Sequence, residues 1–339
     1  MYSKFFGLNE NPFCLTPDTN FLHFTASHRE ALAQLFYGIW YRKGFIVLSA
    51  EVGMGKTLLL NRLLEMLTDN GILSAYIFNP VMTTMEMFEY IAADFGLPCS
   101  IESKSKFLVQ LNDLLIELYS QGKPTVLIVD EAQNLTYEIL EELRMLTNLE
   151  TRKEKLLQII LCGQPELIFK LDRTQMRQLK QRIALRCTLK PLTLEETESY
   201  ILARLRIAGL KGKPPFNDEV IKRIYRFSGG IPRVINNICD NAMLTAFTYE
   251  RTTIDLSIIN EVSENLKLTT PTSALTAHSA LLSKTSEEEA VPVIVPVKAG
   301  QPHTIPRWSS LISPLSRLKR RIIRSVQHIT HTELVDNLK

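Results

Sequence analysis

Stretches of strand and helix character alternate along the first part of the chain. Short runs rich in Ile, Val and Leu predict strands at 44–49, 73–78, 125–129 and 156–162. Between these runs, apolar residues recur at helical spacing, which predicts helices at 26–40, 58–67, 84–94, 104–120 and 138–149. Such alternation is typical of α/β proteins in which a parallel sheet lies between two layers of helices. We therefore expect a three-layer αβα domain built on a parallel sheet.

The alternation stops near residue 192. A capping-box pattern at 192–196 starts a helix to about Ala208, and further helical segments follow at 219–227, 234–247 and 256–266. No strand pattern separates these helices. We therefore expect an N-terminal arm and α/β domain at 1–191, followed by a small all-α domain at 192–268. The arm contains two X-Pro steps, which predict an extended segment rather than a helix.

The last part of the chain differs again in composition. Residues 269–306 are rich in Ser, Thr, Pro and Ala, which predicts a disordered linker. Within 307–339, Ser313 and Pro314 start a basic amphipathic helix with five Lys and Arg residues between 317 and 324. This helix could lie on an anionic membrane surface, dock onto a partner protein, contact nucleic acid or remain a solvated tail. The sequence leaves these alternatives open.

Composition excludes several classes of protein. Hydrophobic residues at 45% and charged residues at 22% describe a soluble globular protein, and no apolar run is long enough for a membrane span. The first residues contain too short an apolar stretch for a secretory signal. The five cysteines are scattered and lack C-x-x-C spacing. This pattern argues against a disulfide framework or a zinc site and favours a reducing, cytoplasmic location.

The net charge of +3 is unevenly distributed along the chain. Residues 269–339 contain 9 Lys and Arg against 5 Asp and Glu, whereas the preceding 268 residues contain 30 against 31. The body of the protein therefore shows no basic bias toward nucleic acid, while the tail does.

The first predicted strand leads into Ala50-Glu51-Val52-Gly53-Met54-Gly55-Lys56-Thr57-Leu58, where a glycine-bearing turn opens into a helix. Strand, turn and helix in this order are the setting of a Walker A phosphate-binding loop. Lys56 would reach the β- and γ-phosphates, and Thr57 would place its hydroxyl on Mg²⁺. Ala50 stands where the pattern usually has its first glycine, and its single methyl group is small enough for the turn. The stretch therefore predicts a site for ATP or GTP.

A pair of carboxylates follows the buried strand at 125–129. Asp130 and Glu131 would lie at the carboxyl edge of the sheet, where open α/β sheets bind their ligands. As a Walker B pair, Asp130 would hold Mg²⁺ through water and Glu131 would orient and polarise the attacking water. A solvated strand end is the alternative, and the phosphate loop upstream disfavours it.

Two further polar segments are candidates. Gln164 follows the strand predicted next to that of Asp130, where an amide could sense the γ-phosphate or make a local hydrogen bond in a turn. Residues 175–189 are rich in basic side chains, among which Arg177 and Lys180 are expected on a solvated helix face.

The order of Asp130-Glu131, Gln164, Arg182 and Gly229-x-Pro-Arg233 resembles the AAA+ ATPases. More closely, the chain is similar to the general secretion pathway protein A group, which includes ExeA-like ATPases and the MshM-like ATPases of MSHA pilus biogenesis. The stretches that carry this resemblance lie between residue 1 and about 268. They are 6–8, 11–13, 16–18, 51–57, 130–133, 146–150, 163–167, 181–182 and 228–233.

The resemblance implies roles beyond those derived from spacing. Arg182 would be an arginine finger given in trans to a neighbouring subunit, which requires a homo-oligomer, commonly a ring. Arg233 would be the sensor of a helical lid formed by 192–268. Gln164 would be sensor 1, where many AAA+ proteins carry Asn or Thr. The cofactors would be ATP and Mg²⁺, and the arm could either pack against the protein or cover the adenine.

As a family member, the chain is expected to hydrolyse ATP to drive assembly of an MSHA-like type IV pilus or a type II secretion apparatus. It would act on envelope assembly proteins at the cytoplasmic face of the inner membrane. Some secretion relatives carry a transmembrane helix and a peptidoglycan-binding region after the lid, and the sequence predicts neither here. The alternatives are a DNA-associated ATPase, of the transposition-helper or replication-initiator kind, and a nucleotide switch with slow turnover. Nucleic acid is the less favoured partner, since no winged-helix pattern follows the lid.

Overall fold

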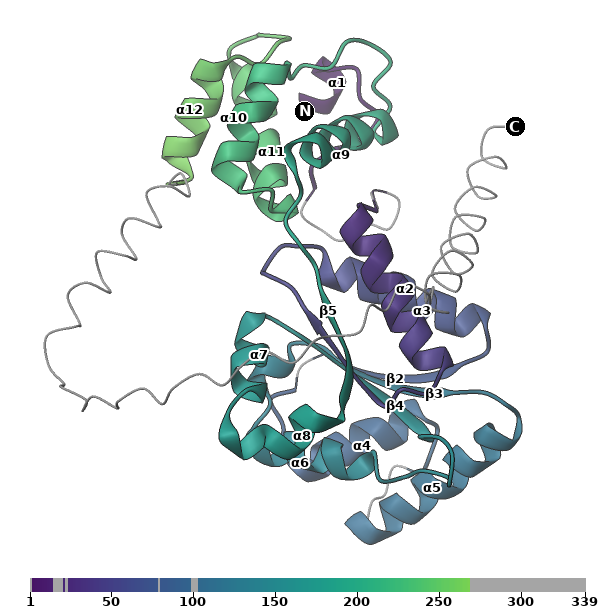
Figure 1. Ribbon diagram of the computed structural model, residues 1–339. Helices are drawn as coiled ribbons and strands as arrows, with labels where there is room; N and C mark the ends of the chain where they lie inside the picture. Colours follow the sequence, from purple (N-terminus) through teal and green to yellow (C-terminus); the bar gives the residue numbers. More distant parts are fainter. Residues whose placement is uncertain (1, 15–20, 22–23, 79, 99–102, 269–339) are drawn as a thin grey trace, which may run out of the picture. The chain divides into compact units, whose positions relative to one another are not determined.

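The computed structural model describes residues 2–14, 21, 24–78, 80–98 and 103–268 (Figure 1). The predicted linker at 269–306 and basic helix at 307–339 lie outside these residues. None of the helices in the described ranges is long and apolar enough to cross a membrane.

A sheet of five parallel strands forms the centre of the α/β part. In spatial order the strands are β2 (Leu73–Ile77), β3 (Thr125–Val129), β4 (Leu157–Gly163), β1 (Phe45–Ser49) and β5 (Ile183–Thr188). Four of them occupy the predicted runs. The sequence reading missed β5, which is an edge strand with Ala184, Arg186 and Thr188 exposed, so that polar residues interrupt its apolar pattern.

Helices cover both faces of this sheet, which confirms the predicted three-layer arrangement (Figure 1). On one face, α2 (Ala26–Trp40) and α3 (Lys56–Asp69) pack against alternate strand residues such as Ile46, Leu48 and Ile128. The intervening strand residues, such as Val47 and Leu127, contact the helices of the other face. These are α4 (Thr84–Asp94), α5 (Lys104–Ser120), α6 (Tyr137–Leu146), α7 (Pro165–Leu171) and α8 (Arg177–Arg182).

The predicted helix at 138–149 is three residues too long at its C-terminal end. Helix α6 ends at Leu146, and the Nη1 of Arg182 donates hydrogen bonds to Arg144 O, Thr147 Oγ1 and Asn148 Oδ1. The leucine spacing continues to Leu149, but these contacts from a distant segment occupy the carbonyl and side-chain acceptors at the helix end.

The helical part has a hydrophobic core of its own. It consists of α9 (Leu194–Ile207), α10 (Asp218–Ser228), α11 (Pro232–Thr248) and α12 (Leu256–Asn265), which bury residues such as Ile201, Ile224 and Ile238 against one another. The capping box predicted at the start of α9 is present, between Thr193 and Glu196. The boundary at 191/192 itself stays a prediction.

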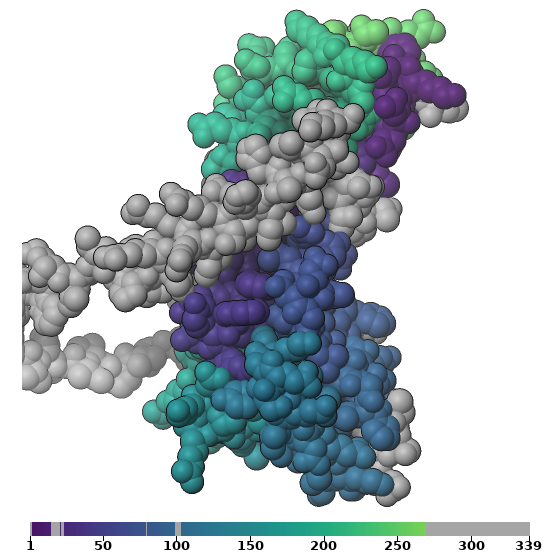
Figure 2. All heavy atoms as spheres, turned by 90° about the vertical axis from the view of Figure 1, so that its right-hand side faces the viewer, coloured from purple at the N-terminus to yellow at the C-terminus, as the bar shows by residue number. Residues whose placement is uncertain are grey.

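The N-terminal arm packs into this same core. Tyr2, Leu8 and Phe13 are buried with the helices α9 to α12, and Figure 2 shows the N-terminal segment in purple against them in green. Residues Tyr2–Phe5 form the short helix α1, so the prediction of a wholly extended arm is wrong there. The Tyr2 hydroxyl lies within hydrogen-bond distance of Asn11 Oδ1 and of Asp240, and Asn11 Nδ2 donates to Asp240 Oδ1, which anchors this turn to α11.

Gly230 should be the most demanding glycine of the helical part. It has φ +77°, and a Cβ on it would lie 2.1 Å from Leu192 O. Gly230→Ala is therefore expected to lower the free energy of unfolding by about 3 kcal/mol, measured by denaturant titration. Gly212, around which a Cβ meets nothing within 4 Å, is the control, and Gly212→Ala should leave stability nearly unchanged. Equal effects of the two substitutions would contradict this account.

Candidate functional site

The predicted phosphate loop forms a tight turn between β1 and α3. Gly53 and Gly55 both have φ +83°, in the left-handed region that favours glycine. Gly55 is the N-cap of α3, and no described side chain caps this helix, so its first N–H groups face the turn. A Cβ on Gly53 would lie 2.6 Å from Arg233 Cβ, so the turn approaches α11 more closely than any larger residue would permit. A turn of this shape suits a polyphosphate.

Lys56 lies at the centre of a charged cluster. Its Nζ is 2.7 Å from Glu131 Oε1 and 3.3 Å from Asp130 Oδ1. Lys56 and Asp130 are buried, whereas the Glu131 side chain is 36% exposed. The sheet order explains the meeting, because β4 lies between β1 and β3 and all three strands end at the same edge. The structure thus brings together the three residues that the sequence placed in one site.

Asp130 and Thr57 supply the oxygen ligands expected of a magnesium site. Asp130 accepts hydrogen bonds from the Tyr76 hydroxyl at 3.1 Å and from the Glu131 N–H at 2.8 Å, and Thr57 is exposed beside Lys56. Mg²⁺ is usually held by one or two carboxylates and by substrate phosphates. A carboxylate and a hydroxyl beside a phosphate turn therefore fit this ion. The described residues form no separate cluster of three His, Cys, Asp or Glu side chains for a metal. Sequence reasoning missed Tyr76, which no motif marks.

Two glutamine amides hold the other oxygen of Glu131. Gln133 Nε2 lies 2.6 Å from Glu131 Oε2, and Gln164 Nε2 lies 3.3 Å from the same oxygen. Gln164 thus lies beside the candidate base, and its predicted role in sensing the γ-phosphate stays a prediction. The sequence showed Gln133 only as part of a matching stretch, and its contact with Glu131 was not foreseen.

The ion pair shifts the pKa of both partners. Burial lowers the pKa of Lys56, but the hydrogen bond to Glu131 and the charge of Asp130 outweigh it, and the net pKa is raised. Burial raises the pKa of Glu131, but hydrogen bonds from Lys56 and Gln133 outweigh it, and the net pKa is lowered. Both groups are therefore ionised at neutral pH, and the site presents a cation and a carboxylate at the mouth of the turn.

His28 on α2 forms a hydrogen bond to the backbone of the phosphate loop. Its Nε2 donates to Met54 O at 2.9 Å, and its Nδ1 lies 2.7 Å from Thr25 Oγ1. Because a carbonyl oxygen only accepts, the proton is on Nε2 and the neutral ring accepts from Thr25 at Nδ1. Burial lowers the pKa of His28, against smaller raising effects of the Met54 hydrogen bond and of Glu196. Sequence reasoning missed this residue, since a lone histidine in a helix carries no motif.

The lowered pKa of His28 predicts a pH-dependent stability. The unfolded chain takes up the proton near the ordinary value of 6.5, whereas the folded chain resists it, so stability is lost as the pH falls through this range to the folded pKa. His28→Gln keeps a donor but does not titrate. The advantage of the wild type over this variant, measured by urea unfolding from about pH 8 to about pH 5, should shrink as the pH falls. A difference that stays constant would contradict the assignment.

A cavity of about 420 Å³ opens over the loop. Residues 51–58, Glu131, Gln164 and Arg233 line it, so most of the predicted binding residues share one cavity. Ala50 is buried behind the loop, and its N–H donates to Gly163 O at 3.0 Å. The backbone N–H of Arg233 donates to Gly53 O at 3.1 Å, which ties the loop directly to α11.

The arm and α9 line the other end of the cavity. Cys14, Phe21, Tyr200 and Arg204 contribute to its wall. Arg204 is buried, donates to Pro12 O, and lies over the Phe21 ring with its guanidinium carbon 4.8 Å from the ring centroid. The arm is therefore packed and also borders the cavity. Its covering of an adenine stays a prediction.

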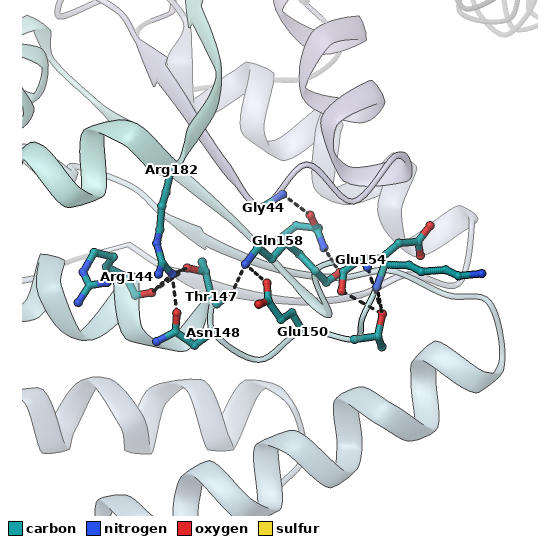
Figure 3. A network of polar contacts seen from close by, with 11 residues as sticks. Gly44, Arg144, Thr147, Asn148, Glu150, Glu154, Gln158 and Arg182 are labelled. Carbon is teal, nitrogen blue, oxygen red and sulfur yellow. Dashed lines mark hydrogen bonds and ion pairs between the residues drawn. The ribbon is translucent and has the colours of Figure 1, made fainter.

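Arg182 lies elsewhere in the molecule. It is outside the set of described residues that line the cavity. Its half-buried side chain points to the end of α6, where Nη1 lies 2.8 Å from Thr147 Oγ1 and 2.7 Å from Asn148 Oδ1 (Figure 3). Arg182 therefore does not serve the cavity of its own subunit in this structure. An action on a neighbouring subunit stays a prediction.

Sequence comparisons identify relatives of this part of the chain. Residues 40–171 match the sequence profile of the family described as AAA domain. Over 249 residues the chain is 44% identical to the general secretion pathway protein A of Aeromonas hydrophila. This match covers 73% of the present chain and 45% of the relative, so the chain spans less than half the length of that protein.

Solved structures of the same fold include two origin-recognition proteins. The structure of Drosophila ORC bound to DNA matches with a TM-score of 0.58 and 16% identity, over 78% of this chain and 66% of that chain. The Aeropyrum pernix ORC2 protein in its ADPNP–ADP complexes matches with a TM-score of 0.54 and 17% identity, over 76% and 72% of the two chains. At such identities the likeness shows the fold alone.

Proposed function

The chain belongs to the AAA+ P-loop proteins and is related to general secretion pathway protein A, and from this premise we propose that it binds and hydrolyses ATP in the cavity over the loop. The observation that carries the proposal is the convergence of Lys56, Asp130 and Glu131 at the mouth of the glycine turn. A phosphate loop with a lysine, together with two carboxylates at the same edge of the sheet, provides the groups that phosphoryl transfer to water requires.

Each residue has a distinct task in this proposal. The N–H groups of residues 53–57 and the Lys56 ammonium bind the β- and γ-phosphates. Thr57 and Asp130 would hold Mg²⁺, which neutralises phosphate charge when bound. Glu131 accepts a hydrogen bond from the attacking water and orients it, because its carboxylate lines the cavity beside the Lys56 ammonium. Gln164 contacts Glu131 and lies where it can sense the γ-phosphate.

Arg233 and Arg182 would connect the site to the rest of an oligomer. The backbone N–H of Arg233 links α11 to the loop at Gly53, so a movement of the helical part on nucleotide exchange would also move the loop. Arg182 would serve a neighbouring subunit as an arginine finger. Arg182 does not line the cavity of its own subunit, so a role in hydrolysis would have to be an action in trans. Such an action requires a ring or other homo-oligomer.

The relationship to general secretion pathway protein A supports a role in secretion, and we propose that this role is the assembly of an envelope secretion apparatus or an MSHA-like pilus. The protein would act at the cytoplasmic face of the inner membrane on assembly components, with residues 307–339 as a basic peripheral contact. The ATP hydrolysis rate with added anionic liposomes, and separately with added DNA, tests this role. Stimulation by liposomes that disappears on deletion of 307–339 would support it. Stimulation by DNA alone would overturn it in favour of a DNA-associated ATPase.

A further inference from the structure

We infer that Gln133 is a positioning residue, which holds the carboxylate of Glu131 in a fixed orientation at the mouth of the glycine turn. The inference rests on the proposed role of Glu131 as the base. Glu131 Oε1 is bound by Lys56, whereas Oε2 is bound by amides, and the amide of Gln133 is the closer of the two at 2.6 Å.

Both polar atoms of the Gln133 amide and its backbone carbonyl are engaged, which fixes the direction of the amide. Its Nε2 donates to Glu131, its Oε1 accepts from the Gln164 N–H at 3.2 Å, and its backbone carbonyl accepts from Lys170 Nζ at 2.6 Å. Because Oε1 faces a backbone N–H, a flipped amide would place two donors against each other. The NH₂ group therefore has to face Glu131.

The backbone on both sides is shaped for this contact. Glu131 has φ +50°, an uncommon value for a residue other than glycine, and begins the short turn η2 (Ala132–Asn134) that brings Gln133 back toward it. Across from it, a Cβ on Gly163 would lie 2.7 Å from Gln133 Oε1, so the end of β4 leaves room for the amide only because it is glycine.

The two kinds of ligand act differently on Glu131. Lys56 binds Oε1 as a cation, and in the proposed function it binds the phosphates as well. The amides of Gln133 and Gln164 bind Oε2 and carry no charge, so they fix the direction of the carboxylate without competing for the phosphates.

The test compares the single-turnover rate of ATP hydrolysis by the full chain with its affinity for a fluorescent ATP analogue. Gln133→Met keeps the length of the side chain but removes the donor, and we expect a rate about ten- to a hundredfold lower. Gln133→Glu also removes the donor and places a like charge beside Glu131, so its rate should fall at least as far. Binding of the analogue should change by less than about threefold in both variants, because neither touches the phosphate turn.

Asn134→Ala is the matched control, since Asn134 is the exposed neighbour of Gln133 on the same turn and should keep the wild-type rate. An unchanged hydrolysis rate in folded Gln133→Met and Gln133→Glu would overturn the inference, as would equal losses in Asn134→Ala. Glu131→Gln separates this failure from that of the proposed function. Wild-type turnover in Glu131→Gln would refute Glu131 as the base, whereas lost turnover there with normal Gln133 variants would refute only the role of Gln133.

Discussion

Glu131→Gln is expected to lower the rate of ATP hydrolysis about 10²- to 10⁴-fold while ATP still binds. The amide has nearly the shape of the carboxylate but cannot accept a proton from water. Lys56 keeps an acidic neighbour in Asp130, at 3.3 Å, so the phosphate turn should stay formed. Single-turnover hydrolysis and binding of a fluorescent ATP analogue, measured on the same preparation, separate the two effects.

Glu166→Gln provides the control for this experiment. Glu166 is exposed in the first turn of α7, so the same chemical change there should leave both hydrolysis and binding unaltered. If Glu131→Gln hydrolysed ATP at the wild-type rate, another group would have to act as the base.

Arg182→Ala is expected to reduce hydrolysis about 10³-fold, with binding of the ATP analogue retained. In the proposed function, the positive charge of Arg182 stabilises the γ-phosphate bound to a neighbouring subunit during hydrolysis, and alanine cannot replace this charge. Arg177→Ala on the same helix should have little effect, because Arg177 is exposed and carries no proposed role.

Mixing the variants distinguishes an action in trans from an effect within one subunit. Arg182→Ala subunits keep Glu131, and Glu131→Gln subunits keep Arg182, so a mixed interface would contain one complete site. Activity should therefore reappear when two inactive variants are combined. Failure to recover activity at every mixing ratio would instead assign Arg182 to the end of α6, where it already contacts Thr147 and Asn148.

Most of the α/β framework was predictable because its strands are buried on both faces. The runs that became β1, β3 and β4 are fully buried, so their patterns are nearly continuous, with Gln158 as the one polar residue inside these three strands. The edge strand β5 was missed because its exposed positions carry residues such as Arg186. The end of α6 was misplaced because the leucine spacing continues to Leu149, whereas the backbone N–H groups of residues 147–149 bond three residues back instead of four.

The residues of the candidate site were likewise predictable only in part. Asp130 and Glu131 were predictable because they come directly after β3, and Lys56 was predictable because it follows the glycine turn after β1. Parallel strands end at one edge of the sheet, so these residues meet there. Gln133 and His28 were not predictable as supporting residues, since their contacts with Glu131 and Met54 depend on a turn and on helix packing. Arg182 was singled out by resemblance alone, and its position away from the cavity could not be read from spacing.

ATP hydrolysis at the glycine turn is tested most directly by comparing the wild type with Lys56→Ala, each with and without Mg²⁺. We expect the wild type to hydrolyse ATP only when Mg²⁺ is present. We also expect Lys56→Ala neither to bind nor to hydrolyse ATP, because the turn has lost the cation that pairs with the phosphates. Hydrolysis by Lys56→Ala at the wild-type rate would contradict the claim that this loop is the site of the reaction.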